Sequence, residues 1–210
     1  FSEGDSPFQH PSPVLCVTQG DTVTIVLHNP LEFDDVSIVF PGQDNVLANG
    51  QPSQPVFSPG GDLTSFAPVA RAKGGTMTYS FVAETPGTYL YHSGTEPAKQ
   101  VNMGLFGALI VRPAGHADWA YNETFLDDTG AVVTTQFKPD TEYVMLLSEI
   151  DPMLHMAVEQ NLPYNMNNYR SRYWLINGRS FPDTIAPNGA EWLPNQPYSS
   201  LVHIHPYNDD

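Results

Sequence analysis

The chain has 210 residues, of which 20 are Pro and 16 are Gly, 15% are charged and 40% are hydrophobic. This composition is typical of a loop-rich globular protein and argues against collagen, a coiled coil or a disordered tail. The 23 Asp and Glu residues against eight Lys and Arg give a net charge of −15. Such a surface repels phosphate backbones, so nucleic acid is a poor partner. The sequence also has no stretch of about 18 apolar residues that could span a membrane.

Two β-branched runs open the series of predicted strands. Residues 14–18 and 22–28 flank a Gln-Gly-Asp turn, a pattern that predicts a β-hairpin. In the second run Val23, Ile25 and Leu27 share one face, because side chains alternate along a strand. This alternation predicts a strand that is half buried in a two-layer sheet.

Further strand candidates follow, each bounded by Pro or Gly. They are residues 36–40, 75–83, 87–92 and 105–112. Several short strands at this spacing favour a sandwich or a barrel, so the expected fold class is all-β. Residues 42–74 show no sustained period, and we expect a long excursion over the surface there.

A second strand series follows a change in composition after residue 113. Its members are residues 142–150, 173–177 and 201–207. A short helix is expected at 153–160, because Asp151 can act as its N-cap and Pro152 fits the first helical position.

We assign residues 1–113 to a first domain, 114–139 to a linker and 140–210 to a second domain. Three strands are too few to close a sandwich of about seven strands. We therefore expect the second domain to be incomplete. Further chain, a partner or packing on the first domain would complete it.

The segment GTYLYHSG at 87–94, followed by GLFGALIV at 104–111, resembles the last strands of the first domain of multicopper oxidases. The family has GTYWYHSH before GLYGALIV at that place. Other segments that resemble family motifs, in chain order, are QGDTV at 19–23, SIVFPG at 37–42 (SIHWHG in the family), TYSF at 78–81, YVMLLSEI at 143–150 and WLINGR at 174–179. The last two are similar to the opening of the family's second domain.

This resemblance implies a cupredoxin-like Greek-key β-sandwich, followed by an incomplete second cupredoxin-like domain. It also implies an extracellular, periplasmic or cell-surface parent protein that oxidises a substrate with copper and reduces O₂. The chain would be the N-terminal scaffold portion of that parent. The alternative is a non-enzymatic extracellular cupredoxin-like module for assembly or interaction. The expected partners are the remaining domains of the parent, another chain that completes the second sheet, or a second copy.

The copper positions that the resemblance implies are mostly replaced. A trinuclear copper cluster takes imidazoles from His-x-His pairs, because alternate strand residues point the same way. Val39 and Pro41 stand where the first pair would be, and of the second pair only His92 is present, with Gly94 in place of its partner. We therefore expect copper in the parent protein, none within these 210 residues, and no oxidase activity of this segment alone.

Three histidines are the candidate metal ligands. His203 and His205 form the remaining His-x-His pair, and two imidazoles on one strand face bind Cu²⁺ or Zn²⁺ only weakly without further ligands. The alternative for this pair is the polar face of an unfinished strand. His92 is either a remnant ligand or an imidazole hydrogen-bonded in the core between Tyr91 and Ser93.

Other chemistries find little support in the sequence. The single cysteine, Cys16, excludes an internal disulfide and zinc sites built from two or four cysteines. A blue copper site needs a thiolate with two imidazoles, and Cys16 lies far along the chain from His92. A Gly-x-Ser-x-Gly elbow is absent, so a hydrolase is not supported.

Overall fold

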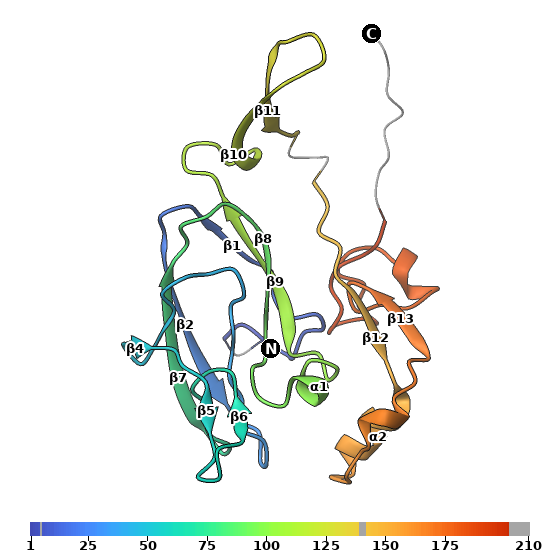
Figure 1. Ribbon diagram of the computed structural model, residues 1–210. Coiled ribbons are helices and arrows are strands. Elements are labelled where there is room, and N and C mark those ends of the chain that lie inside the picture. The colour runs from blue at the N-terminus through green and yellow to red at the C-terminus, as the bar shows by residue number, and fades with distance from the viewer. Residues whose placement is uncertain (5, 139–141, 202–210) are drawn as a thin grey trace. The chain divides into compact units, whose positions relative to one another are not determined.

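The computed structural model describes residues 1–4, 6–138 and 142–201. The chain divides into two compact units, one of residues 12–136 and one that joins residues 1–11 to those from 137 onward. Strands outnumber helices among the described residues (Figure 1), and the expected all-β class is confirmed. The domain limits at 113 and 140 stay a prediction. The first eleven residues, which we assigned to the first domain, group with the C-terminal unit.

Two larger sheets form the body of the first unit, which we call the sandwich unit. One sheet has the order β1-β9-β8, with β1 parallel and β8 antiparallel to β9. The other has the order β2-β7-β3-β4 and is antiparallel. The strands are β1 (Leu15–Thr18), β2 (Thr22–Asn29), β3 (Leu47–Ala48), β4 (Gln51–Pro52), β7 (Gly75–Val82), β8 (Gly87–His92) and β9 (Phe106–Arg112).

The predicted hairpin at the start of the chain is wrong. β1 pairs with β9 and β2 pairs with β7, so the chain changes sheets between the two runs. The turn is fixed at this corner because the Gln19 amide donates to the Arg112 carbonyl and the Gly20 amide to that of Ala83. A turn with alternating flanks fits both a hairpin and such a corner. The predicted half-burial of β2 is confirmed, because its residues alternate between exposed and covered positions.

Aromatic side chains fill the space between the two sheets. The ring of Phe40 lies 5.0 Å from that of Phe81 and 5.9 Å from that of Tyr79, both on β7. On the other sheet its neighbour is Tyr91 of β8, at 6.3 Å. All four side chains are buried, and each contributes roughly 1.5–3 kcal/mol by leaving water. Residue 40 is therefore anchored between the sheets, which fixes the segment around it.

The segment at 36–40 is not a continuous strand. Val36 forms an isolated bridge with Ala70, and Val39 forms one with His92. The long excursion at 42–74 holds four short strands rather than a structureless loop. Two of them, β3 and β4, extend the β2-β7 sheet, and β5 (Val56–Phe57) and β6 (Leu63–Ser65) form a two-stranded ribbon.

The segment expected to be a linker contains a β-hairpin. β10 (Trp119–Leu126) pairs antiparallel with β11 (Val132–Gln136). Asp127 shapes the turn, because its Oδ1 accepts hydrogen bonds from the amides of Thr129 and Ala131. Nearly every residue of both strands is exposed, so the hairpin contributes little to the core.

The C-terminal unit contains β12 (Leu147–Ile150), antiparallel to β13 (Tyr173–Ile176), and the helix α2 (Pro152–Glu159). The helix expected there is confirmed. Asp151 is its N-cap and accepts from the Met153 amide at 2.8 Å. Hydrogen bonds from the Tyr164 hydroxyl and the Arg170 amide hold the pKa of Asp151 at about 2. The strand expected at 201–207 lies, apart from residue 201, outside the described residues.

The buried guanidinium of Arg179 organises the irregular chain after β13. Its Nε donates to the carbonyl of Gln196 at 2.8 Å, and its Nη1 donates to that of Ala186 at 2.8 Å. Further carbonyls at Asp183 and Pro187 lie within 3.4 Å. A buried charge needs this many partners, because leaving water is costly. Two short 3₁₀ turns, η2 (Met166–Asn168) and η3 (Asp183–Ile185), complete the unit.

The N-terminal segment packs into the C-terminal unit through His10. Its amide donates to the Asn195 carbonyl at 2.7 Å, and its own carbonyl would lie 2.1 Å from a Cβ at Gly178, which has φ of 79°. Only glycine fits that position. Burial, followed by the positive charges of His155 and the N-terminus, lowers the pKa of His10 to about 4. The neutral imidazole is therefore the form that the fold accepts.

The His10 contribution to stability should depend on pH. The unfolded chain protonates His10 near the ordinary histidine pKa of 6.5, and the folded chain does so near 4. We expect this difference to lower the free energy of unfolding by about 2 kcal/mol between pH 7.5 and pH 5. The loss begins as the pH falls below about 6.5 and ends below about 4. Urea unfolding of the chain and of His10→Gln measures it, and an unchanged pH slope in the variant contradicts the assignment.

Candidate metal centre

Two neighbouring segments carry the positions at which the resemblance places copper ligands. Val39 and Pro41 flank the buried Phe40, and His92 ends β8 immediately before Ser93 and Gly94. The amide of Val39 donates to the His92 carbonyl at 2.9 Å, and the His92 amide returns a bond of 3.2 Å to Val39. The fold therefore brings residues 39, 92 and 94 together, as the resemblance implies.

The side chains at these positions do not fit a copper centre. Val39, Pro41 and Gly94 have no side-chain atom that can donate an electron pair to a metal. His92 can, but its Nδ1 lies 2.9 Å from the carbonyl oxygen of Ser93. In the tautomer with a proton on Nδ1 this contact is a hydrogen bond, and only Nε2 is left to bind a metal. Among the described residues no three His, Cys, Asp or Glu side chains gather closely enough to hold an ion.

Gly94 has no room for a side chain. A Cβ at this position would lie 2.8 Å from Ser37 Oγ, 2.9 Å from Val39 Cγ1 and 3.3 Å from Phe66 Cβ. The carbonyl of Gly94 accepts a hydrogen bond from the Phe66 amide at 2.9 Å, which holds the neighbouring segment against it. The place of the second imidazole is therefore filled by other atoms.

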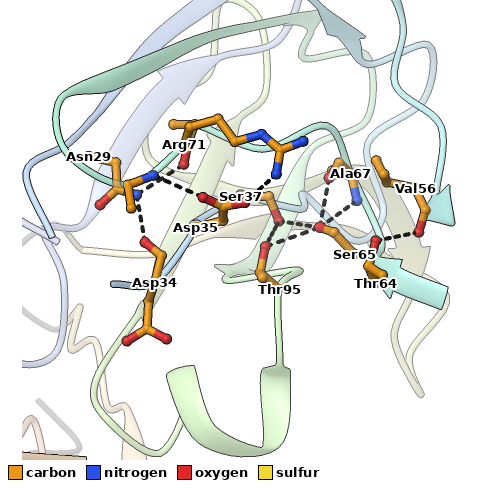
Figure 2. Close-up of polar contacts among 12 residues, drawn as sticks. Asn29, Asp34, Asp35, Ser37, Val56, Thr64, Ser65, Ala67, Arg71 and Thr95 are labelled. Carbon is orange, nitrogen blue, oxygen red and sulfur yellow. Dashed lines mark hydrogen bonds and ion pairs between the residues drawn. The ribbon is translucent and has the colours of Figure 1, made fainter. Parts of the chain in front are cut away.

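Three buried hydroxyl groups lie close together (Figure 2), and one of them, that of Ser37, borders Gly94. Ser37 Oγ is 2.9 Å from Ser65 Oγ and 3.0 Å from Thr95 Oγ1, and the third side of this triangle is 3.1 Å. Ser65 donates its own proton to the carbonyl of Ala67 at 2.7 Å. The protons of Ser37 and Thr95 then serve two of the three sides, and each oxygen also has acceptor capacity. The hydroxyl cluster Ser37–Ser65–Thr95 thus satisfies itself.

The polar network continues into the short helix α1 (Pro97–Gln100). Ser93 Oγ donates to Gln100 Oε1 at 2.6 Å, and Gln100 Nε2 donates to the backbone carbonyl of Asp35 at 2.9 Å. Ser93 Oγ also accepts from the Thr95 amide at 3.1 Å. Ser93 and Gln100 are buried, as the members of the hydroxyl cluster are. The whole buried network is uncharged.

The nearest carboxylates already have cationic partners. Asp35 accepts from Arg71 Nη1 at 2.6 Å, which Figure 2 shows, and Asp34 accepts from Lys99 Nζ at 2.6 Å. Asn29 ties the same segment down, because its Nδ2 donates to the carbonyls of Asp34 and Ala70. Partly exposed pairs of this kind contribute about 1 kcal/mol or less. They hold the rim of the network and leave neither of these carboxylates directed into it.

Sequence reasoning found part of this site. His203 and His205 lie outside the described residues, so a role for them stays a prediction. Ser37 is the first residue of the recognised segment at 37–42, and Thr95 directly follows the one at 87–94. Both could have been noticed as polar residues close to missing ligands. The sequence contains no indication of a role for Ser65, because this residue lies in the excursion at 42–74, which shows no sustained period. Cys16 is exposed on β1.

A family model, described as multicopper oxidase, matches residues 8–116. A multicopper oxidase of Byssochlamys spectabilis, VdtB, is 31% identical over 150 residues, which cover 68% of this chain and 19% of that protein. L-ascorbate oxidase of Cucumis sativus is 34% identical over 105 residues, covering 50% of this chain and 16% of that enzyme. The chain thus spans less than a fifth of these curated relatives.

Solved structures of copper proteins share the fold. A copper nitrite reductase from Nitrosomonas europaea superimposes with a TM-score of 0.52 and 24% identity, over 91% of this chain and 52% of that one. A blue copper oxidase from the same organism gives 0.55 and 23%, over 86% and 48%. At this identity the likeness concerns the fold alone, and it confirms the expected cupredoxin-like architecture.

The crowding at Gly94 is tested by adding a single methyl group. We expect Gly94→Ala to lower the free energy of unfolding by about 1–3 kcal/mol, because the new Cβ overlaps Ser37 and Val39. Gly60→Ala is the control, since a Cβ there would have no neighbour closer than 3.6 Å. Urea unfolding followed by circular dichroism compares the two variants. Equal stabilities would contradict the filled site.

Proposed function

The chain belongs to the multicopper oxidase family, and from this premise we propose that it is the N-terminal scaffold portion of an oxidase whose copper is bound outside these 210 residues. The observation that carries the proposal is the combination of an intact cupredoxin-like sandwich with non-donor side chains at residues 39, 41 and 94. A site that had merely lost a metal would keep its donors. Here the space at Gly94 holds atoms of Ser37 and Val39 instead.

The proposed task of the sandwich unit is to present a rigid surface to the copper-bearing domains of the parent. That parent would couple the oxidation of a substrate to the reduction of O₂. The residues of this chain then hold strands in place and exclude water, and they transfer no electrons themselves. An extracellular, periplasmic or cell-surface location accords with this proposal. None of the described helices has the length and apolarity that a membrane crossing requires.

Copper titration of the chain tests the proposal that this segment binds no copper. We expect no blue absorption band and no stoichiometric type 2 EPR signal when Cu²⁺ is added, because one imidazole does not make a closed site. His92→Gln is the matched control, and its titration should look the same. A blue band or a one-to-one EPR signal that disappears in His92→Gln would refute a copper-free segment.

Elemental analysis of the full-length parent tests whether that parent is an oxidase. Bound copper in the parent supports the oxidase.

A second candidate function is a non-enzymatic extracellular module for assembly. Large side chains of the C-terminal unit favour it: Trp174 is 70% exposed, Phe181 79% and Trp192 65%. Exposed apolar side chains of this size mark an interaction site when they lie together on the surface. The remaining domains of the parent, another chain that completes the second sheet, or a second copy would cover them.

The oligomeric state of the chain distinguishes between these three possible partners. Because the net charge of −15 opposes self-association, we expect sedimentation velocity to show a monomer at low salt. A dimer that disappears in Trp174→Ser or Phe181→Ser, but not in a variant of the exposed hairpin such as Thr124→Ser, would instead identify a second copy as the partner.

A further inference from the structure

The hydroxyl cluster joins three segments that are remote along the chain. Ser37 lies beside the anchored Phe40, Ser65 ends β6, and Thr95 directly precedes the turn into α1. The residue separations across the triangle are 28, 30 and 58. Bringing the ends of such long loops together costs chain entropy when the protein folds. The cluster therefore joins segments that local structure alone would not hold together.

The ribbon of β5 and β6 depends on this cluster. In the described part of the chain these two strands form a ladder only with each other, and the one further pairing is an isolated bridge between Ser65 and Thr95. An isolated two-stranded ribbon is at best marginally stable in water. Its end is attached to the body by the Ser65–Thr95 bridge, by the bond from the Phe66 amide to the Gly94 carbonyl, and by the Ser65 hydroxyl. Two of these three links pass through the cluster.

The chemistry of the cluster is unsuited to a metal. Copper prefers imidazole and sulfur ligands, and neutral hydroxyl groups are weak donors in comparison. The protons that hold the triangle together would also have to be displaced by an ion. Ser37 and Ser65 are 0% and 2% exposed, so the oxygen atoms are closed to solvent.

We propose that the hydroxyl cluster Ser37–Ser65–Thr95 is a metal-independent latch that closes the former ligand space and fastens the β5–β6 ribbon to the sandwich. The latch makes the stability of the sandwich unit independent of copper. It also means that imidazoles returned to residues 39, 41 and 94 do not form a copper site, because Ser37 Oγ and Phe66 occupy the space at residue 94. The proposal of a latch does not depend on whether the parent protein is an oxidase.

Three substitutions of threonine test the latch. Thr95→Val keeps the shape of the side chain and removes the hydroxyl, which leaves Ser37 and Ser65 with one partner fewer. We expect the folding equilibrium constant to fall about ten- to a hundredfold. Thr95→Ser keeps the hydroxyl and should change it by less than about threefold, as should Thr88→Val on the exposed side of β8.

Urea unfolding of the 210-residue chain measures these constants, and amide hydrogen exchange locates the effect. In Thr95→Val the amides of residues 56–66 should exchange faster, whereas those of β2 and β7 should not. If Thr95→Val does not fold while Thr95→Ser does, the latch is supported as well. The proposal is overturned if Thr95→Val behaves like Thr88→Val, or if all three variants lose stability equally.

A copper experiment tests the closed space separately. The triple variant V39H/P41H/G94H is examined by circular dichroism and by EPR with one equivalent of Cu²⁺. Either an unfolded chain or a folded chain without a stoichiometric type 2 signal supports closure. A folded variant that binds one copper tightly overturns it. Copper binding by the unmodified chain would instead count against the proposed function, so the two failures are distinguishable.

Discussion

The close approach of three chain segments at Gly94 is the constraint on which the sandwich unit depends. Backbone hydrogen bonds join Val39 to His92 and Phe66 to Gly94. A Cβ at residue 94 would crowd this meeting point, because it would lie 2.8 Å from Ser37 Oγ, 2.9 Å from Val39 Cγ1 and 3.3 Å from Phe66 Cβ. The space next to Gly94 has room for the hydroxyl group of Ser37, and it has no room for an imidazole on residue 94. The choice of small residues therefore decides both the packing and the absence of ligand chemistry at one point of the fold.

A copper centre and a hydroxyl cluster connect strands by different means. A metal needs unprotonated donors, space and a compensating charge balance, and it links its ligands only when it is bound. Hydroxyl groups supply both protons and lone pairs, so Ser37, Ser65 and Thr95 connect their segments without any added ion. Asp34 and Asp35 are paired with Lys99 and Arg71 at the rim, which leaves the interior neutral. The cupredoxin-like fold can thus persist after the ligands have been replaced.

Local signals predicted the elements that depend on neighbouring residues. The alternation in β2 predicted which of its faces is covered, and the Asp151-Pro152 pair predicted the start of α2. The hairpin of β1 and β2 was wrong, because the partner of a strand is chosen by distant residues and the turn fits both outcomes. The ribbon of β5 and β6 was missed for a similar reason, since its two- and three-residue strands are too short to show a period.

The sequence by itself determined the all-β class, the family resemblance and the loss of donor atoms at Val39, Pro41 and Gly94, because side-chain chemistry and strand alternation are properties of each residue and its nearest neighbours. Only the tertiary structure decided what took their place. Ser65 reaches Ser37 and Thr95 across gaps of 28 and 30 residues, and His10 joins the C-terminal unit across most of the chain. Such contacts depend on how whole segments pack, so no local pattern encodes them.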